Sequence, residues 1–380
     1  MSRARPMRKV AMTSTGPTQN QASQRVGVAP AVSALNIARK LPTAGSPSAE
    51  ALAAGLGATP AHNLRFRGGR TIQHLTYVNL FIGGSAAWSS SDIQNVDRAL
   101  AAIMTDSRLD IVVNQYFPNG PASTTAAPSQ LISILAPKKV SRASIDSLVR
   151  KHVVAAGRLN QFDAKTTVFN FLLPRGVVLT TDGGAQAVIG ETASSIPSVQ
   201  TVTTIRSGDS ITTVTVSTTS DDTAKPSGDH DGGHDGGVLG GDPDDAASSL
   251  AGLGGYHGSV HVAGTVVYFA VGVFSEILSN GSENGIVAFA EPWKNIVATF
   301  YHELQEARTD PDVEDAIRTQ NDKFIGWNSD QGEEIGDFPV FEASGQLQQV
   351  FKEVTLVNGT TAPIQLLYSN RVNGPEDPTV

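Results

Sequence analysis

The stretch Pro292-Trp-Lys-Asn-Ile-Val-Ala-Thr-Phe-Tyr-His-Glu-Leu-Gln-Glu-Ala-Arg308 has the hydrophobic spacing of an amphipathic helix and carries the most informative polar residues of the chain. At about 100° per residue, the apolar positions from Ile296 to Ala307 share one face. His302 and Glu306 are four residues apart, so they project together from another face. The pattern predicts a helix that packs through its apolar face and presents a histidine and a carboxylate to a cleft.

His302, Glu303 and Glu306 form a His-Glu-x-x-Glu string, which indicates a divalent-metal site of the zincin type. In the related His-Glu-x-x-His string, the glutamate after the first histidine is the general base that activates metal-bound water. By this logic His302 and Glu306 are candidate metal ligands, and Glu303 is the candidate catalytic base. A carboxylate as the second ligand favours harder cations, but zinc also accepts it. The predicted cofactor is zinc or another divalent cation.

Two further carboxylates, Glu334 and Asp337, lie about thirty residues beyond this pair. A distal carboxylate returned by a helix and a turn can complete the coordination sphere of a zinc site. Glu333, Glu334 and Asp337 would also repel one another unless a cation or an arginine neutralised them. We therefore expect either Glu334 or Asp337 to be a metal ligand, and the sequence does not choose between them.

Strands and helices alternate through the rest of the chain, which predicts an α+β fold with an α/β-like core and a zincin-like mixed sheet beside the metal-site helix. The expected strands are residues 72–82, 111–117, 166–173, 177–181, 259–274 and one or two strands within 346–370. The other expected helices are a segment capped by Ser90 or Ser91, residues 141–156, and residues 311–318 capped by Asp310.

Composition divides the chain into four parts. Residues 1–65 are predicted to be a disordered or loosely attached N-terminal arm, with a short helix over Ala31–Lys40. Residues 66–182 and 251–380 are expected to be the two halves of the core. Between them, residues 183–250 are rich in Ser, Thr, Gly and Asp and predict a flexible insertion with one weak hairpin inside 188–219.

Charge and cysteine content exclude several classes of function. The net charge is −8 and no basic stripe is present, so a nucleic-acid partner is not expected. The chain has no cysteine, so any metal must be bound by His, Asp or Glu. No apolar run is long enough to cross a bilayer, and the basic start lacks the apolar segment of a signal peptide. The protein is expected to be soluble, with its compartment and oligomeric state left open.

Other candidate residues have a simpler structural interpretation. His257 and His261 lie at or before a strand, and either could approach the metal cleft because zincins place an edge strand beside the active helix. The prediction nevertheless favours packed or surface histidines. The Gly/Asp/His tract 229–237 is predicted to be a solvating linker, because an unstructured site must become ordered before it binds metal. Tyr301 and Tyr368 are possible donors to an oxyanion, and the sequence assigns neither.

The metal-site region resembles bacterial members of the EXORDIUM-like, phosphate-induced protein family. The resemblance is carried by His302–Pro311, Gly326-Trp327, Gly332–Asp337, Tyr77–Ile82 with Trp88, Gly255–Gly258 with Val266–Ala270, and Leu366–Asn370. It implies a zincin-like site with His302 and Glu306 as ligands, Glu303 as base and Glu334 or Asp337 as the further ligand. Plant relatives are secreted and linked to cell growth, and many lack the His-Glu-x-x-Glu string, so the fold can serve without catalysis.

Three functions are compatible with these residues. The first is a metal-dependent hydrolase, peptidase-like, that acts on a peptide or protein substrate. The second is a non-catalytic domain in which the same residues hold a structural cation and the surface serves cell-envelope or carbohydrate interaction. The third is a carboxylate network that holds no metal. The number of protein ligands around a bound ion separates the first two, because a catalytic site keeps one position open for water.

Overall fold

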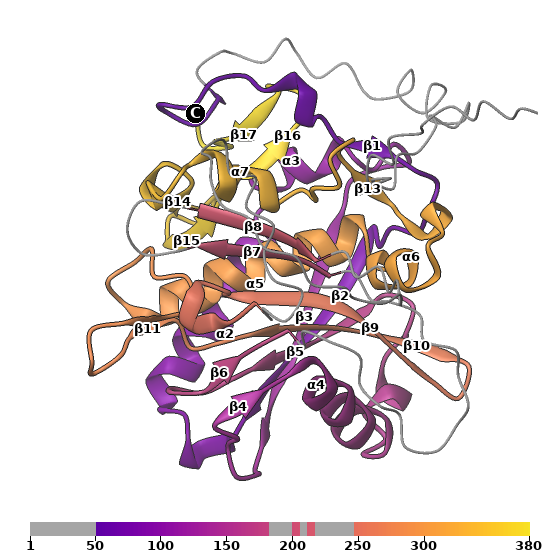
Figure 1. Cartoon of the computed structure of the whole chain (residues 1–380), viewed down its shortest axis with the longest axis vertical. Helices are drawn as coiled ribbons and strands as arrows, with labels where there is room; N and C mark the ends of the chain where they lie inside the picture. The colour runs from indigo at the N-terminus through magenta and orange to yellow at the C-terminus, as the bar shows by residue number, and fades with distance from the viewer. Residues whose placement is uncertain (1–50, 182–199, 206–210, 217–246) are drawn as a thin grey trace, which may run out of the picture.

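The computed structural model describes residues 51–181, 200–205, 211–216 and 247–380, and its centre is a five-stranded mixed sheet (Figure 1). In spatial order the strands are β3 (Ser123–Ile132), β2 (His74–Ile82), β5 (Thr167–Leu172), β10 (Thr265–Gly272) and β9 (Gly255–Val262). The first four run parallel, whereas β9 is an edge strand antiparallel to β10. The predicted α+β class is confirmed.

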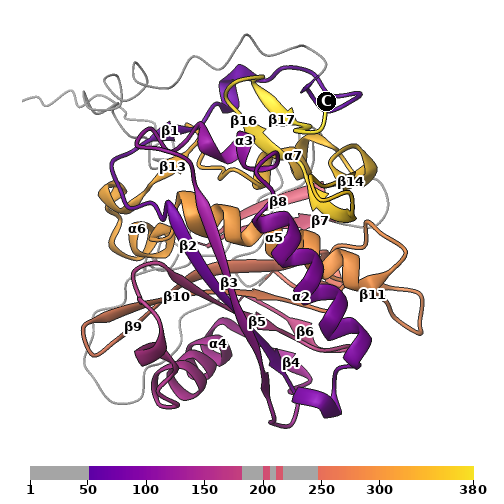
Figure 2. The ribbon, with the colours of Figure 1, turned by 180° about the vertical axis from the view of Figure 1, so that it is seen from behind.

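Helices cover both faces of this sheet (Figures 1 and 2). On one face lie α2 (Ser90–Met104) and α5 (Pro292–Thr309), and on the other lies α4 (Arg142–Val149), which continues into a π-helical turn over Arg150–Val154. The central strands are therefore buried on both sides, which explains why β5 reads as a continuous buried run rather than an alternating one. Each face has its own hydrophobic cluster.

Helix α5 is the structural centre of the molecule, because every residue from Asn295 to Thr309 is buried. Its apolar side chains, such as Phe300 and Leu304, pack in the larger hydrophobic cluster, as the spacing predicts. Its polar face is also covered, by β15 (Thr361–Gln365) and by the edge strand β9. The histidine and glutamates of α5 are therefore buried groups rather than members of a solvated helix face.

Smaller elements complete the fold. In the part of the chain that the structure describes, six strand pairs lie outside the main sheet: β1 (Arg65–Phe66) with β13 (Trp327–Asn328), β4 (Lys139–Val140) with β6 (Val178–Leu179), β7 (Gln200–Ile205) with β8 (Ile211–Val216), β11 (Glu276–Ile277) with β12 (Glu283–Asn284), β14 (Phe351–Thr355) with β15, and β16 (Leu367–Ser369) with β17 (Gly374–Glu376). The short helices are α3 (Asp110–Asn114), α6 (Val313–Thr319), α7 (Asp337–Glu342) and 3₁₀ turns at Pro60–His62, Gly84–Ala86, Arg158–Gln161, Ser249–Ala251, Asp322–Phe324 and Leu347–Gln349.

Two predictions of strands are wrong in an instructive way. The β-branched stretch 111–117 is not a strand but contains helix α3, because the buried contacts of Val112 and Val113 outweigh their local β preference. The single strand predicted over 259–274 belongs to the β9–β10 hairpin, whose turn has positive φ at Ala263 (48°) and Gly264 (81°).

Strand β3 was not expected, because its burial is low and it contains Pro128, which is tolerated only at an edge.

Two predicted caps are also wrong. Ser89 caps α2 by accepting a hydrogen bond from the Asp92 amide, in place of Ser90 or Ser91. Asp312 stands at the N-cap of α6 in place of Asp310.

The last part of the predicted N-terminal arm is attached to the core. The Ala53 amide donates to the Pro375 carbonyl at 2.8 Å, Leu52 forms a bridge with Glu376, and Leu64 is buried. Residues 51–65 are therefore packed against the core, although the sequence places them in the arm. The predicted hairpin within 188–219 is present as β7 and β8, whereas the helix over Ala31–Lys40 and the tract 229–237 lie outside the described residues.

Within the described ranges, no helix combines the length and apolar character needed to cross a membrane.

Candidate metal centre

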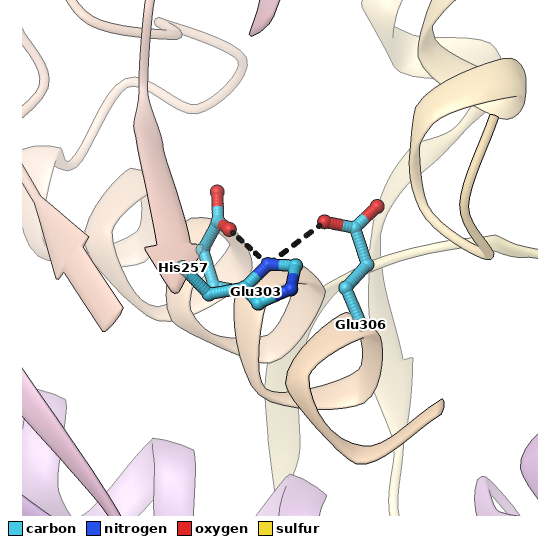
Figure 3. A group of neighbouring side chains, drawn as sticks. All are labelled: His257, Glu303 and Glu306. Atoms are coloured by element: carbon cyan, nitrogen blue, oxygen red, sulfur yellow. Dashed lines mark ion pairs between the residues drawn. The ribbon is translucent and has the colours of Figure 1, made fainter. Parts of the chain in front are cut away.

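His302, Glu303 and Glu306 lie on consecutive turns of α5. Figure 3 shows how His257, from the edge strand β9, reaches Glu303 and Glu306. These four residues are between 3% and 8% exposed. The distances from His257 Nδ1 are 3.5 Å to Glu303 Oε2 and 3.6 Å to Glu306 Oε2. A helix and the neighbouring strand therefore bring two histidines and two carboxylates together in the interior.

The orientation of His302 is set by Gln365, which stands at the end of β15. His302 Nδ1 lies 2.7 Å from Gln365 Oε1, and Gln365 Nε2 donates to the Gly336 carbonyl at 2.6 Å. Because the amide oxygen is an acceptor, His302 Nδ1 carries a proton, and Nε2 is the nitrogen that is left to bind a cation once it is deprotonated. Nε2 faces Glu306 Oε2 at 3.1 Å. In metal sites, the histidine nitrogen that does not bind the metal usually donates a hydrogen bond of this kind, which fixes the orientation of the ring.

Gly336 allows this arrangement by its lack of a side chain. A Cβ at this position would lie 2.5 Å from His302 Nδ1, inside van der Waals contact. The Gly336 amide also donates to Glu306 Oε1 at 3.1 Å, so this backbone holds both predicted ligands.

The two downstream carboxylates occupy different places. Asp337, the first residue of α7, has its Oδ1 4.0 Å from His302 Nε2 and belongs to the buried group His302, Glu306 and Asp337. Glu334 lies on the other side, with Oε1 3.6 Å from His257 Nε2. The Glu334 amide donates to Asp337 Oδ2 at 3.1 Å, which holds the loop between them closed. The distances therefore favour Asp337 over Glu334 as the partner of His302 and Glu306.

His257 is the residue that the sequence interpretation undervalued. It was predicted to be a packed or surface histidine, yet it stands 7% exposed against Glu303, Glu306 and Glu334. Its Nε2 lies 3.3 Å from the Asp310 carbonyl, which leaves Nδ1 facing Glu303 and Glu306. The only local signal was its place in a strand, because 45 residues separate it from His302. The second histidine, His261, is half exposed and pairs with Asp315 at 2.9 Å.

Burial and charge act against each other at this site. Burial alone would lower the pKa of His302, but Glu306 beside it raises that pKa to about 10. Burial would raise the pKa of Glu306, yet His302 and His257 hold it down at about 2. For Glu334 burial prevails and the pKa is well above the ordinary value. The pKa of Asp310, raised by the same cause, is about 7. Protons therefore neutralise part of the negative charge in the cluster, at the place that a cation could occupy.

The residues present fit a divalent cation. Two buried groups of three, His257-Glu303-Glu306 and His302-Glu306-Asp337, each bring their ligating atoms within 4.8 Å of one another. Oε1 of Glu334 is buried and receives no hydrogen bond from any described residue. Buried carboxylates without such partners are costly unless a cation neutralises them.

The remaining candidates lie elsewhere. A hollow is lined by His257, His302, Glu303, Glu306, Glu334 and Asp337 together with neighbouring apolar residues. Tyr301 of α5 packs in the larger hydrophobic cluster, and the Tyr368 hydroxyl donates to the Thr59 carbonyl at 2.6 Å, so neither lines this hollow. Asp310 accepts a hydrogen bond from the Gly326 amide at 2.9 Å.

Comparisons of this chain with protein-family models, curated proteins and solved structures found no match.

Proposed function

We propose that this protein is a metal-dependent hydrolase acting on peptide bonds, with zinc or a similar divalent cation held by His302, Glu306 and Asp337. The observation that carries the proposal is the buried group formed by these three residues, with Glu303 beside it. Three protein ligands are the number that a catalytic zinc site uses, because the fourth position serves water or substrate. Glu303 is the additional carboxylate that such a reaction requires as a base.

Each polar side chain then has a defined task. A bound cation would supply Lewis acidity, polarising the scissile carbonyl and making water more acidic. Glu303 accepts the proton of the attacking water and returns it to the leaving amine. Its burial raises its pKa, which brings this carboxylate closer to the range in which a general base also acts as an acid. Gln365 holds the ring of His302 in the orientation that presents Nε2.

The apolar residues that line the hollow favour a peptide substrate with an apolar residue near the cleaved bond. Ile286, Val313, Ile317 and Val340 line the same hollow as the carboxylates. Apolar walls with a few polar groups are typical of small-molecule and peptide sites. An acidic side chain would be repelled by the carboxylates, so a neutral or basic peptide fits better. The resemblance to the EXORDIUM-like family agrees with this proposal at the same residues.

The second candidate function is a structural cation in a non-catalytic domain that serves cell-envelope or carbohydrate interaction. A specific observation favours it. His257 lies 3.6 Å from Glu306 and 3.6 Å from Glu334, so these residues could add protein ligands to a cation bound at Glu306 and leave no position for water. A structural site is closed by four protein ligands, whereas a catalytic site is not. The two functions therefore differ in hydrolysis rather than in metal content.

Elemental analysis and a mixed peptide library test the proposal with wild type, Glu306→Gln and Glu303→Gln. We expect wild type to contain metal and cleave peptides, and Glu306→Gln to lose both properties. Glu303→Gln is expected to keep the ion at His302 while kcat falls by about 10²–10⁴-fold. Glu353→Gln is the control, because Glu353 is exposed and pairs with Lys294 outside the hollow. Metal without cleavage in wild type would favour the structural function, and wild type without metal would overturn both.

A further inference from the structure

Two histidines, not one, present a nitrogen to the same buried hollow. His302 Nδ1 is tethered to Gln365 and leaves Nε2 free, and His257 Nε2 is tethered to the Asp310 carbonyl and leaves Nδ1 free. The tether is the same device in both cases, a hydrogen bond that selects the tautomer and aims the other nitrogen. A single predicted ion at His302 uses only one of these two nitrogens.

Glu306 stands between the two histidines. Its Oε2 is 3.1 Å from His302 Nε2 and 3.6 Å from His257 Nδ1. It is also the residue common to both buried groups, with Asp337 on the His302 side and Glu303 on the His257 side. A carboxylate shared in this way is able to bridge two cations, as in sites that hold two metal ions about 3.5–4 Å apart.

The charge of the hollow agrees with two ions. Four carboxylates line it, Glu303, Glu306, Glu334 and Asp337, and they face the two histidines. No lysine or arginine is among its described lining residues. Glu314 also lines it but is neutralised by Arg142 at 2.6 Å. Metal binding requires neutral histidines and ionised carboxylates, and the four negative charges of that state would be balanced by two divalent cations. Glu334 is 5% exposed, and its Oε1 receives no hydrogen bond from the described residues and lies beside His257.

We propose that the hollow binds two divalent cations that share Glu306, one on His302 and Asp337 and the other on His257 and Glu303. The inference rests on the proposed function, because the first of these ions is the one assigned there. Zinc and manganese are both suitable, since the donors are imidazole nitrogens and carboxylate oxygens. Glu303 then has a second task, because it holds the second ion as well as accepting a proton.

Metal stoichiometry tests this inference directly. Metal-free full-length protein is titrated with Zn²⁺ by calorimetry, and bound zinc is counted after dialysis. Wild type is expected to bind two equivalents, His257→Ala one, and His302→Ala one. His261→Ala is the matched control, because His261 lies on the same strand but is half exposed and paired with Asp315, and it is expected to bind two. Loading with Mn²⁺ adds an independent readout, since two ions that share a carboxylate give a spin-coupled resonance spectrum.

A wild-type stoichiometry of one would overturn the inference, and it does not depend on whether any variant folds. Two equivalents in His257→Ala, with the folded circular dichroism spectrum of wild type, would also overturn it. The two proposals fail separately. One ion with peptide cleavage leaves the proposed function standing without the second ion, whereas two spin-coupled ions without cleavage support the dinuclear site and count against the hydrolase.

Discussion

Two clusters of charged side chains lie side by side along strand β9, one partly buried and one buried, and they differ in how their charges are neutralised. Next to Ser259, Arg142 donates to both oxygens of Glu314, at 2.6 and 2.9 Å, and the Ser259 amide donates to Glu314 Oε2 at 2.7 Å. Next to His257, the carboxylates of Glu303 and Glu306 face histidines and one another.

The difference separates a structural contact from a candidate metal site. The Arg142–Glu314 cluster is neutral and its hydrogen bonds are made within the protein, so it fastens α4 and α6 to the sheet edge. The Glu306 cluster has more negative than positive groups and is stabilised by protons, since the pKa of Glu334 is well above its ordinary value through burial. A cluster whose charges are paired within the protein stabilises the fold, whereas buried carboxylates in excess of their basic partners favour binding of a cation. The predictions below test this contrast.

The largest expected effect comes from Glu306→Gln, which removes the carboxylate shared by both groups. Wild type should be stabilised by Zn²⁺, by about 2.7 kcal/mol at a free concentration 100 times the Kd. The variant should lose this gain, because glutamine lacks the charge that holds the ion. Thermal unfolding with and without Zn²⁺ measures the difference. An equal gain in Tm for the variant would contradict the assignment of Glu306.

Arg142→Met should destabilise the protein by about 2 kcal/mol, because it leaves the largely buried Glu314 without its charged donor. Urea unfolding measures the loss, and the double variant with Glu314→Gln should recover part of it. Bound metal should be unchanged, because this cluster is already neutral. A loss of metal in Arg142→Met would show that the two clusters are coupled rather than independent.

Gly336→Ala should weaken Zn²⁺ binding by about 10-fold, because the new methyl group would displace the His302 ring from Gln365. Competition with a chelator measures the affinity. Gly57→Ala is the matched control, since a Cβ there meets no atom within 4 Å. Equal affinities for the two variants would mean that the ring of His302 is not held in the way described.

The smallest effect is expected at Glu342, a carboxylate with neither an arginine nor a place in the metal cluster. Its Oε2 receives no hydrogen bond from the described residues, and burial raises its pKa to about 7. A raised pKa in the folded state stabilises the protein at low pH, and this contribution disappears as pH rises from about 4.5 to about 7. Glu342→Gln should therefore raise Tm by about 1–2 °C more at pH 8 than at pH 4. Equal differences at both pH values would contradict this account.

The sequence by itself determined the helix that carries the site. The spacing of Ile296, Phe300 and Leu304 predicted its buried face, and the four-residue interval predicted that His302 and Glu306 project together. These features are local, since hydrogen bonds within a helix place residues three and four apart on one side. The alternation of strands and helices likewise predicted the α+β class.

The tertiary structure decided everything that depends on contacts between distant segments. His257 joins the site because β9 lies at the sheet edge beside α5, and Gln365 orients His302 across 63 residues of chain. The choice of Asp337 over Glu334 as the neighbour of His302 depends on the turn that leads into α7. Packing also made a helix of the β-branched stretch at Val112. Local spacing does not encode strand order or packing, so the sequence predicted one half of the site and only the fold brought the second histidine to it.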